Sequence, residues 1–268
     1  MGRLSISAAW DESKVILARD GGLMGAVALA LIVLPQVVLA VVGAPIGAEA
    51  TAVTRAVYFA VLCLGFVAQI ALNRLAIGPS TTVKDAMAQG FVRLLPVFVV
   101  VLAVFVVVAV VATIVAMGLG AGGVAVMSKA GEPSPALLLV LIVLMVASFA
   151  VLQLVFPVAA AETGNPLRLA SRSWQLSGGN YWRLFAFVCV IFVGLGVVII
   201  ATQLGIGSVV VLLLGPPNPG SMSALIIGLV AGLIQAAFTV VTAAMLARMY
   251  LQIAGRSEAQ ASVPSSGI

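Results

Sequence analysis

The sequence predicts an all-α, polytopic membrane protein with six transmembrane helices and short cytoplasmic interfacial helices. Hydrophobic residues make up 63% of the 268 residues and charged residues only 8%, whereas a soluble domain carries about 25% charged residues. Arg183 and Arg248 bracket 64 residues without a charge, which is enough for two membrane-spanning helices and a turn. Lys and Arg are also concentrated in alternate connections between the apolar runs, as they are in multi-pass proteins.

Six apolar ranges are long enough to cross a bilayer. The predicted spans cover residues 22–43, 54–74, 94–118, 136–160, 183–214 and 222–250. The third and fifth ranges exceed what about 30 Å of hydrocarbon requires, so we expect tilted, kinked or extended helices there. Together the spans form one membrane domain over residues 1–252, and we expect residues 253–268 to be a disordered cytoplasmic tail.

The basic residues predict the orientation of the chain. Arg55 and Lys129 lie in connections on one side of the predicted membrane. Connections on the other side contain the remaining eleven: Arg3, Lys14, Arg19, Arg74, Lys84, Arg93, Arg168, Arg172, Arg183, Arg248 and Arg256. Because cytoplasmic connections carry an excess of Lys and Arg, this distribution predicts that both termini are cytoplasmic.

Each odd-numbered span follows a short amphipathic segment with a glycine break and a basic residue. The predicted breaks are Gly21-Gly22, Gly90 and Gly178-Gly179. In the third segment, Asn165 suits an N-cap and Pro166 suits the first helical position. The pattern fits a three-fold internal repeat of helix hairpins. It fits equally the general preference of membrane helices for a basic interfacial anchor.

The third amphipathic segment, residues 166–183, concentrates aromatic and basic residues in an otherwise apolar chain. Amphipathic rings suit the boundary between headgroups and hydrocarbon, and each basic residue near an anionic surface contributes about 1 kcal/mol. We therefore expect this segment to lie along the cytoplasmic headgroup layer. The predicted headgroup contacts are Arg168, Arg172, Trp174, Tyr181, Trp182 and Arg183.

Glu162 follows the fourth span at the predicted cytoplasmic boundary. Arg74 and Arg248 leave neighbouring even-numbered spans at the same depth. A structural clamp, in which Glu162 pairs with one of these arginines, is one interpretation. The other is a solvated interfacial acid whose ion pair contributes under about 1 kcal/mol.

Polar residues inside the spans allow two further interpretations. Gln69, Asn73, Gln153 and Gln235 predict either a polar seam that binds a small substrate in a permease, or hydrogen bonding between helices. The absence of a charged residue at mid-membrane favours hydrogen bonding. Gly228 and Gly232 form a GxxxG motif, and we expect it to allow close helix packing within the bundle.

One stretch carries a family resemblance. The matching residues, spread over about 30 positions, are Pro157, Glu162, Leu169, Ala170, Ser173, Leu176, Gly178, Trp182 and Arg183. With these residues the chain resembles the glycerophosphoryl diester phosphodiesterase membrane-domain family, a group of uncharacterised bacterial six-span proteins. The resemblance implies a bacterial cytoplasmic (inner) membrane protein. It does not imply phosphodiesterase activity, because the catalytic domain of that family's enzymes has no counterpart here.

The composition argues against most catalytic chemistry. The chain has no histidine, so histidine-based nucleophilic or metal sites are excluded, and the carboxylates are scattered over the connections. We expect no cofactor, no metal and no nucleic-acid partner. The predicted function is a non-enzymatic, lipid-interacting membrane protein or scaffold, with membrane lipids and another membrane or cytoplasmic protein as partners. The alternative is a permease or efflux-type transporter.

Overall fold

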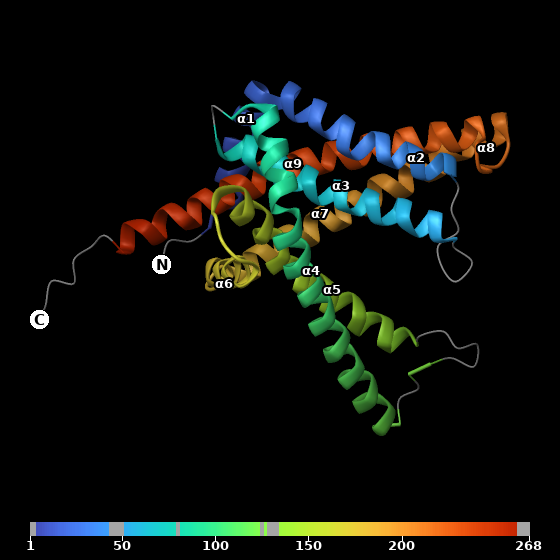
Figure 1. Cartoon of the computed structure of the whole chain (residues 1–268). Helices are drawn as coiled ribbons and strands as arrows, with labels where there is room; N and C mark the ends of the chain where they lie inside the picture. Colours follow the sequence, from blue (N-terminus) through green and yellow to red (C-terminus); the bar gives the residue numbers. More distant parts are fainter. Residues whose placement is uncertain (1–3, 43–50, 79–80, 124–125, 128–133, 262–268) are drawn as a thin grey trace, which may run out of the picture.

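The fold is a bundle of long helices (Figure 1). The computed structural model describes residues 4–42, 51–78, 81–123, 126–127 and 134–261, with side chains described as far as residue 255. The elements are α1 (Ile6–Ala28), the π-helical turn η1 (Leu29–Val33), α2 (Leu34–Val42), α3 (Ala52–Ile77), α4 (Val83–Ala121), α5 (Pro135–Ala161), α6 (Pro166–Ser177), α7 (Tyr181–Thr202), the π-helical turn η2 (Gln203–Gly207), α8 (Ser208–Leu214) and α9 (Met222–Ala261).

Six segments of the described chain are long and apolar enough to cross a membrane. They are Ile6–Val42, Ala52–Ile77, Val83–Ala121, Pro135–Ala161, Tyr181–Leu214 and Met222–Gly255. The prediction of an all-α protein with six such helices is confirmed. Each predicted span falls inside one of these segments, apart from residue 43, which lies outside the described residues.

The first and fifth of these segments each contain a π-helical turn. Pro35 lies inside α2, two residues after η1 ends. A proline has no N–H and frees the carbonyl four residues earlier, which is Leu31 in η1. The wider turn therefore accommodates the proline without ending the helix. The fifth segment contains η2, between α7 and α8, without a proline.

The predicted glycine breaks are correct at one position of three. Gly21 and Gly22 lie inside α1, and Gly90 lies inside α4, so these amphipathic segments continue directly into their spans. A glycine costs a helix only about 1 kcal/mol, which continuous apolar packing overrides. Only α6 is a separate short helix in the described chain, and it ends before Gly179, whose φ is 82°. Two of the three proposed hairpin units therefore lack a separate interfacial helix.

Gly90 has a packing role instead of ending a helix. A Cβ atom at this position would lie 2.9 Å from the Val67 carbonyl oxygen and 2.9 Å from its Cγ1. The glycine therefore allows α3 and α4 to cross closely, where a larger side chain would separate them.

The predicted disordered tail is also wrong for its first part. Helix α9 continues from Met222 to Ala261, through residues that were expected to be disordered from 253 onward. Ala, Glu and Gln are good helix formers and one glycine does not stop a helix. Residues 262–268 lie outside the described residues.

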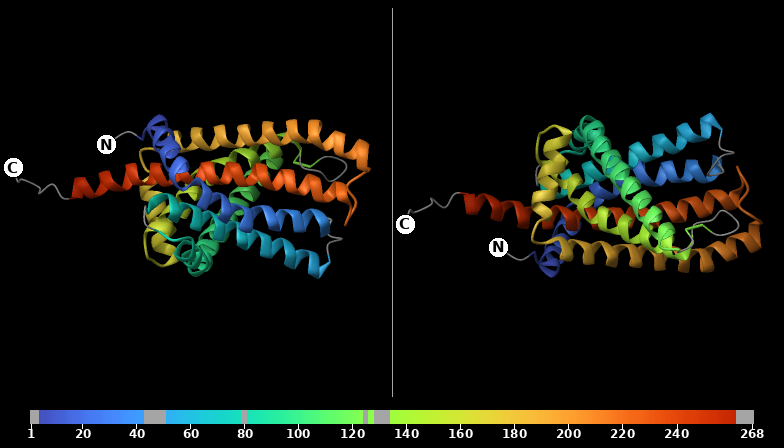
Figure 2. Two further views of the ribbon diagram at one scale, coloured as in Figure 1. Left: turned by 90° about the horizontal axis from the view of Figure 1, so that it is seen from above. Right: turned by 90° about the horizontal axis from the view of Figure 1, so that it is seen from below.

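Helix α9 is the central element of the bundle. It packs against α1, η1, α2, α3, α5, α6, α7 and α8. Helices α4 and α5 run at a steep angle to the remaining long helices and diverge from α3 away from α6 (Figure 1). Two further views show α6 lying across one end of the bundle, at a steep angle to α7 and α9 (Figure 2).

The GxxxG motif packs within the bundle, as predicted. A Cβ atom at Gly232 would lie 3.2 Å from Val33 Cα and 3.3 Å from Gln36 Cβ, and one at Gly228 would collide with Ala40 Cβ. The two glycines thus bring α9 into close contact with η1 and α2. Such contacts between small residues are a main source of helix association in lipid.

Candidate functional site

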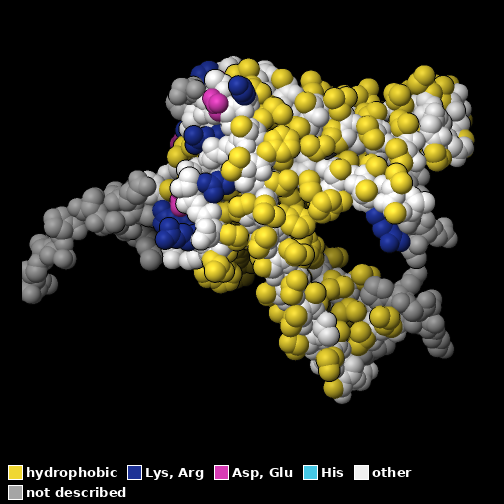
Figure 3. Space-filling model, viewed as in Figure 1, with side chains coloured by type: hydrophobic (Ala, Val, Ile, Leu, Met, Phe, Trp, Pro, Cys, Tyr) yellow, Lys and Arg dark blue, Asp and Glu magenta, His cyan; other side chains and the backbone are white. Residues whose placement is uncertain are grey.

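Most of the described basic side chains gather where α6 lies, and we call this region the basic end. It is defined by Arg74, Arg93, Arg168, Arg172, Arg183 and Arg248. The surface view shows Lys and Arg side chains concentrated at this end, while apolar side chains cover most of the long helices (Figure 3). A polar network therefore surrounds the helix termini here.

The end of α5 accepts hydrogen bonds from two neighbouring helices. Arg74 Nη1 on α3 and Gln89 Nε2 on α4 donate to the Ala160 carbonyl oxygen, at 3.2 and 2.9 Å. Arg93 Nη1 donates to the Gly164 carbonyl at 3.3 Å. The last carbonyls of a helix lack partners inside it and carry partial negative charge. Cationic and amide donors from α3 and α4 therefore stabilise the end of α5.

Glu162 joins α5, α6 and α9. Its Oε1 atom accepts from Arg172 Nε at 3.1 Å and from the Tyr250 hydroxyl at 2.9 Å. The prediction that Glu162 is a clamp residue identified the right region but not its partners. Arg74 instead bonds the Ala160 carbonyl, and Arg248 Nη2 donates to the Ala76 carbonyl at 3.4 Å. Because α6 folds back beside the end of α5, Arg172 reaches the carboxylate.

Helix α6 has one buried face and one exposed face. Leu169, Ser173, Leu176 and Ser177 are buried against the bundle. On the exposed face, Leu167 is 84% exposed and Trp174 is 71% exposed, and Trp182 at the start of α7 is 76% exposed. Asn165 is the N-cap residue, as predicted, but its side chain makes no capping hydrogen bond.

The exposed apolar and aromatic side chains and the exposed Arg168 therefore belong to the same end of the bundle. Amphipathic rings next to a basic residue are typical of the boundary between water and lipid. This arrangement keeps three of the six predicted headgroup residues on the surface: Arg168, Trp174 and Trp182.

The other three predicted headgroup residues make protein contacts. Arg172 pairs with Glu162. Arg183 Nη1 donates to the backbone carbonyl of Leu4, and the backbone N–H of Leu4 donates to Asn180 Oδ1 at 3.1 Å. The Tyr181 hydroxyl donates to the Ala147 carbonyl at 3.2 Å. No sequence pattern predicts the Leu4 contact, because it joins positions 179 residues apart.

A hollow opens between the α5–α6 connection and α6, and we call it the α6 hollow. It has a volume of about 410 Å³. Residues 162–164 form one wall, and the α6 side chains Leu167, Arg168, Ser171, Arg172 and Gln175 form the other. The hollow therefore brings together three residues that the sequence analysis had assigned to two different roles: Glu162, Arg168 and Arg172.

Among the four polar residues of the predicted seam, Asn73 and Gln153 are buried and Gln69 and Gln235 are half-buried, and their described hydrogen bonds stay within single helices instead of joining helices as predicted. Asn73 Nδ2 donates to the Gln69 backbone carbonyl at 2.8 Å, and the Gln235 carbonyl accepts from Thr239 Oγ1 at 2.7 Å. Asn73 is fully buried and Gln153 is 7% exposed. The side-chain oxygens of Gln69, Asn73 and Gln153 have no hydrogen-bond partner among the described residues.

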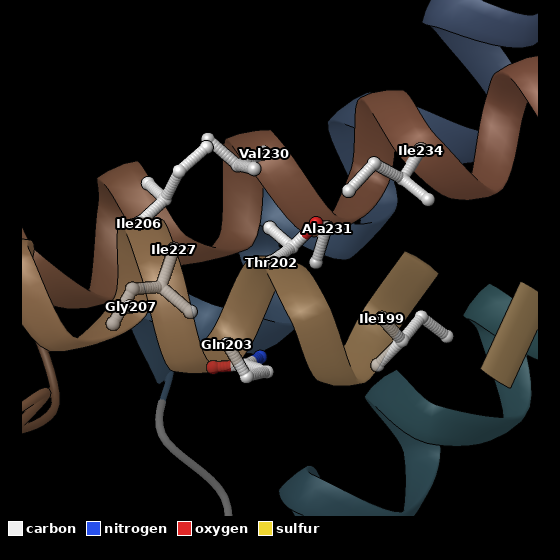
Figure 4. A pocket seen from close by; sticks show the side chains of 9 residues that line it. All are labelled: Ile199, Thr202, Gln203, Ile206, Gly207, Ile227, Val230, Ala231 and Ile234. Carbon is white, nitrogen blue, oxygen red and sulfur yellow. The ribbon is translucent and has the colours of Figure 1, made fainter. Parts of the chain in front are cut away.

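An apolar pocket lies between the fifth segment and α9 (Figure 4). Its volume is about 20 Å³, which is close to what one water molecule needs. Thr202 and Gln203 approach it from the fifth segment, and Ala231 and Ile234 from α9. No seam residue lines this pocket or the α6 hollow. A further hollow of about 590 Å³ beside η2 and α8 is lined mainly by apolar residues such as Val211, Leu212 and Ile227. The α6 hollow is the better candidate for a polar ligand, because charged side chains line it.

The described residues contain no group of three or more Cys, Asp or Glu side chains close enough to hold a metal ion. Cys63 and Cys189 are free thiols. The chemistry at the basic end is therefore that of guanidinium, carboxylate, hydroxyl and amide groups.

Comparisons with known proteins give a family but no activity. No curated protein and no solved structure matches the chain. A family model matches residues 5–253, which include the first five apolar segments and all but the last two residues of the sixth. The chain therefore belongs to the family described as "Domain of unknown function (DUF7847)".

Proposed function

We propose that this protein is a non-enzymatic, multi-pass protein of the bacterial inner membrane that binds phospholipid headgroups at its basic end. In this proposal the basic end faces the cytoplasm. Membrane lipids are its first partners, and a second membrane or cytoplasmic protein is a further partner that it positions at the membrane surface.

The observation that carries the proposal is the position and surface of α6. This helix lies across the ends of the long helices (Figure 2) and keeps Leu167, Trp174 and Arg168 exposed. A helix in this position is parallel to the membrane surface if the long helices cross the bilayer. Its apolar side chains then reach the hydrocarbon boundary while Arg168 reaches lipid phosphates.

The charge distribution supports the orientation. Eleven of thirteen Lys and Arg residues belong to connections on the side of the basic end, counted over the whole sequence. Cytoplasmic connections carry such an excess. Reporter fusions at positions near 48, 128 and 218 test the orientation: we expect periplasmic signals, and cytoplasmic signals would contradict it.

Packing of the polar residues favours this proposal over a permease. Asn73 and Gln153 are buried between helices, and none of the four seam residues lines the α6 hollow or the apolar pocket of Figure 4. Transporter sites are usually formed by broken helices around a cavity at mid-membrane, whereas the larger of these two hollows lies at the end of the bundle.

Headgroup binding is tested with the purified, detergent-solubilised protein. Native mass spectrometry counts bound phosphatidylglycerol across a titration. We expect Arg168→Gln to weaken binding about fivefold, since one basic residue near an anionic surface contributes about 1 kcal/mol. Arg55→Gln is the matched control, because it makes the same charge change at an exposed residue of the opposite end. Equal binding by both variants across a salt series would overturn the proposal.

A further inference from the structure

The α6 hollow contains charges of both signs. Arg168 and Arg172 supply two guanidinium groups, and Glu162 supplies one carboxylate. Its volume of about 410 Å³ lies within the range of small-molecule sites, about 300–1,000 Å³. A ligand that fills the hollow therefore meets two cations and one anion.

The cations of the hollow keep donors available for a ligand. Arg172 uses Nε for its bond to Glu162 at 3.1 Å, and its side chain is 31% exposed. Its two Nη groups, and the whole guanidinium of Arg168, make no hydrogen bond among the described residues. Ser171 and Gln175 lie on the same wall and bond each other at 3.4 Å. Guanidinium and hydroxyl donors in this arrangement are suited to phosphate oxygens.

The anion of the hollow also keeps an acceptor available. Both bonds to Glu162, from Arg172 and Tyr250, end on Oε1. Its Oε2 atom accepts no hydrogen bond from a described residue, and the side chain is 34% exposed. A carboxylate oxygen in this state favours a charged donor such as a primary ammonium group.

From this pairing we infer that the α6 hollow selects a phospholipid headgroup that carries both a phosphate and a primary ammonium group. The phosphate lies against Arg168 and the Nη groups of Arg172, and the ammonium lies against Glu162 Oε2. Phosphoethanolamine has this chemistry. A phosphoglycerol headgroup lacks the second charge, and a phosphocholine headgroup has a quaternary nitrogen without N–H donors.

The surroundings of the hollow favour a lipid over a soluble phosphate compound. Leu167 lines the hollow and is 84% exposed, and Trp174 on the same helix is 71% exposed. These side chains place the hollow at headgroup depth when α6 lies on the membrane. The inference rests on the proposed function, since it specifies which headgroup the basic end binds.

The first experiment needs no variant. The wild-type protein is titrated with phosphatidylethanolamine and its mono-, di- and trimethylated forms, and with phosphatidylglycerol of the same acyl chains. We expect phosphatidylethanolamine to bind about tenfold more tightly than the trimethylated form or phosphatidylglycerol. The reason is that only its primary ammonium group adds a charge-assisted hydrogen bond to Glu162. Equal affinity throughout the methylated series would overturn the inference.

The second experiment assigns the selectivity to the hollow. Glu162→Gln keeps an acceptor for Arg172 and Tyr250 but removes the negative charge. We expect it to abolish the tenfold preference for phosphatidylethanolamine. Asp85→Asn is the matched control, because Asp85 is an exposed carboxylate at the start of α4 outside the hollow. A preference that survives in Glu162→Gln would overturn the inference.

The results distinguish the headgroup selectivity from the proposed function, and a lipid from a soluble phosphate compound. If phosphatidylethanolamine and phosphatidylglycerol bind equally and both depend on Arg168, the selectivity fails while the proposed function stands. If binding of neither lipid depends on Arg168, both the selectivity and the proposed function fail.

Soluble O-phosphoethanolamine should bind at least about tenfold more weakly than the lipid, because it lacks the apolar contacts. Equal affinity would overturn the assignment to a lipid.

Discussion

The basic end and the opposite half of the bundle are held together by different contacts. Large side chains that are fully buried, such as Leu72, Leu154, Leu169 and Leu246, belong to the half of the bundle next to α6. Farther from α6, the apolar side chains of α4, α7 and α8 are largely exposed, and the α4–α5 pair diverges from α3 (Figure 1). All the long helices thus converge at the basic end, whereas at the opposite end α4 and α5 separate from the others.

Polar bonds between helices explain the convergence. At the basic end, the Ala160 carbonyl, the Gly164 carbonyl and Glu162 accept from side chains of four different elements. In the opposite half, α9 meets α2 through Gly228 and Gly232. Apolar burial between helices contributes little in lipid, so association depends on hydrogen bonds and on close packing of small residues. In the outer part of α4, bulky apolar side chains predominate, and the hydrogen bond of the Thr113 hydroxyl goes to the Ala109 carbonyl of the same helix, so no described polar bond holds this part of α4 to α3.

The largest effect is expected from breaking the close contact in the opposite half. Gly232→Leu places a side chain where a Cβ would already lie 3.2 Å from Val33 Cα. We expect the free energy of unfolding to fall by about 3 kcal/mol, at the upper end of overpacking costs. Reversible unfolding in mixed detergent micelles measures the change.

Gly196→Leu is the control for this substitution, because a Cβ at Gly196 meets nothing within 4 Å. We expect it to leave the unfolding free energy almost unchanged. Equal stability of the two variants would mean that α2 and α9 are not in close contact.

An intermediate effect is expected from removing the clamp at the basic end. Glu162→Ala deprives Arg172 and the Tyr250 hydroxyl of their acceptor. We expect a loss of about 1.5 kcal/mol, because bonds to a charged group are strong but this carboxylate is one-third exposed. The same unfolding assay measures it.

Asp11→Ala serves as the comparison, because it removes an exposed ion pair between Asp11 and Lys14. Exposed pairs contribute little, and we expect a loss below about 0.5 kcal/mol. If the two substitutions cost the same, the Glu162 bonds do not hold α5, α6 and α9 together.

The smallest effect is expected where two donors share one acceptor. Arg74 and Gln89 both donate to the Ala160 carbonyl, so either residue satisfies it when the other is removed. We expect Gln89→Met to cost about 0.5 kcal/mol. The double variant with Arg74→Met should cost about 1 kcal/mol more than the two single changes added together, because an unpaired carbonyl is then left. Additive losses in a double-mutant cycle would contradict this sharing.

Much of the fold was predictable because its main signal is local. Long apolar runs identify spans without knowledge of their neighbours, and Asn165-Pro166 correctly marks the start of α6. The glycines were harder to interpret. Gly178-Gly179 ends a helix because Gly179 adopts a positive φ, whereas Gly90 stays helical because Val67 packs against it. The sequence does not distinguish the two kinds of glycine, because the role of Gly90 depends on its contact with another helix.

The candidate site was predictable in composition but not in pairing. Glu162 and its neighbouring cations are evident from the sequence. Arg74, Arg172 and Arg248 were all available at one depth, and only the way α6 folds back beside α5 brings Arg172 to the carboxylate. The contact between Arg183 and the Leu4 carbonyl depends on a backbone atom, which no pattern of side chains reveals.

The position of α9 has a consequence for the biogenesis of the protein. Translation produces this helix after every helix that it contacts. Until α9 is made, the earlier helices therefore lack one of their packing partners. The α2 surface that packs against Gly228 and Gly232 is one such uncovered face. The described packing of these helices is therefore complete only after α9 is made, so a ribosome that stalls before residue 222 leaves a chain without its central helix.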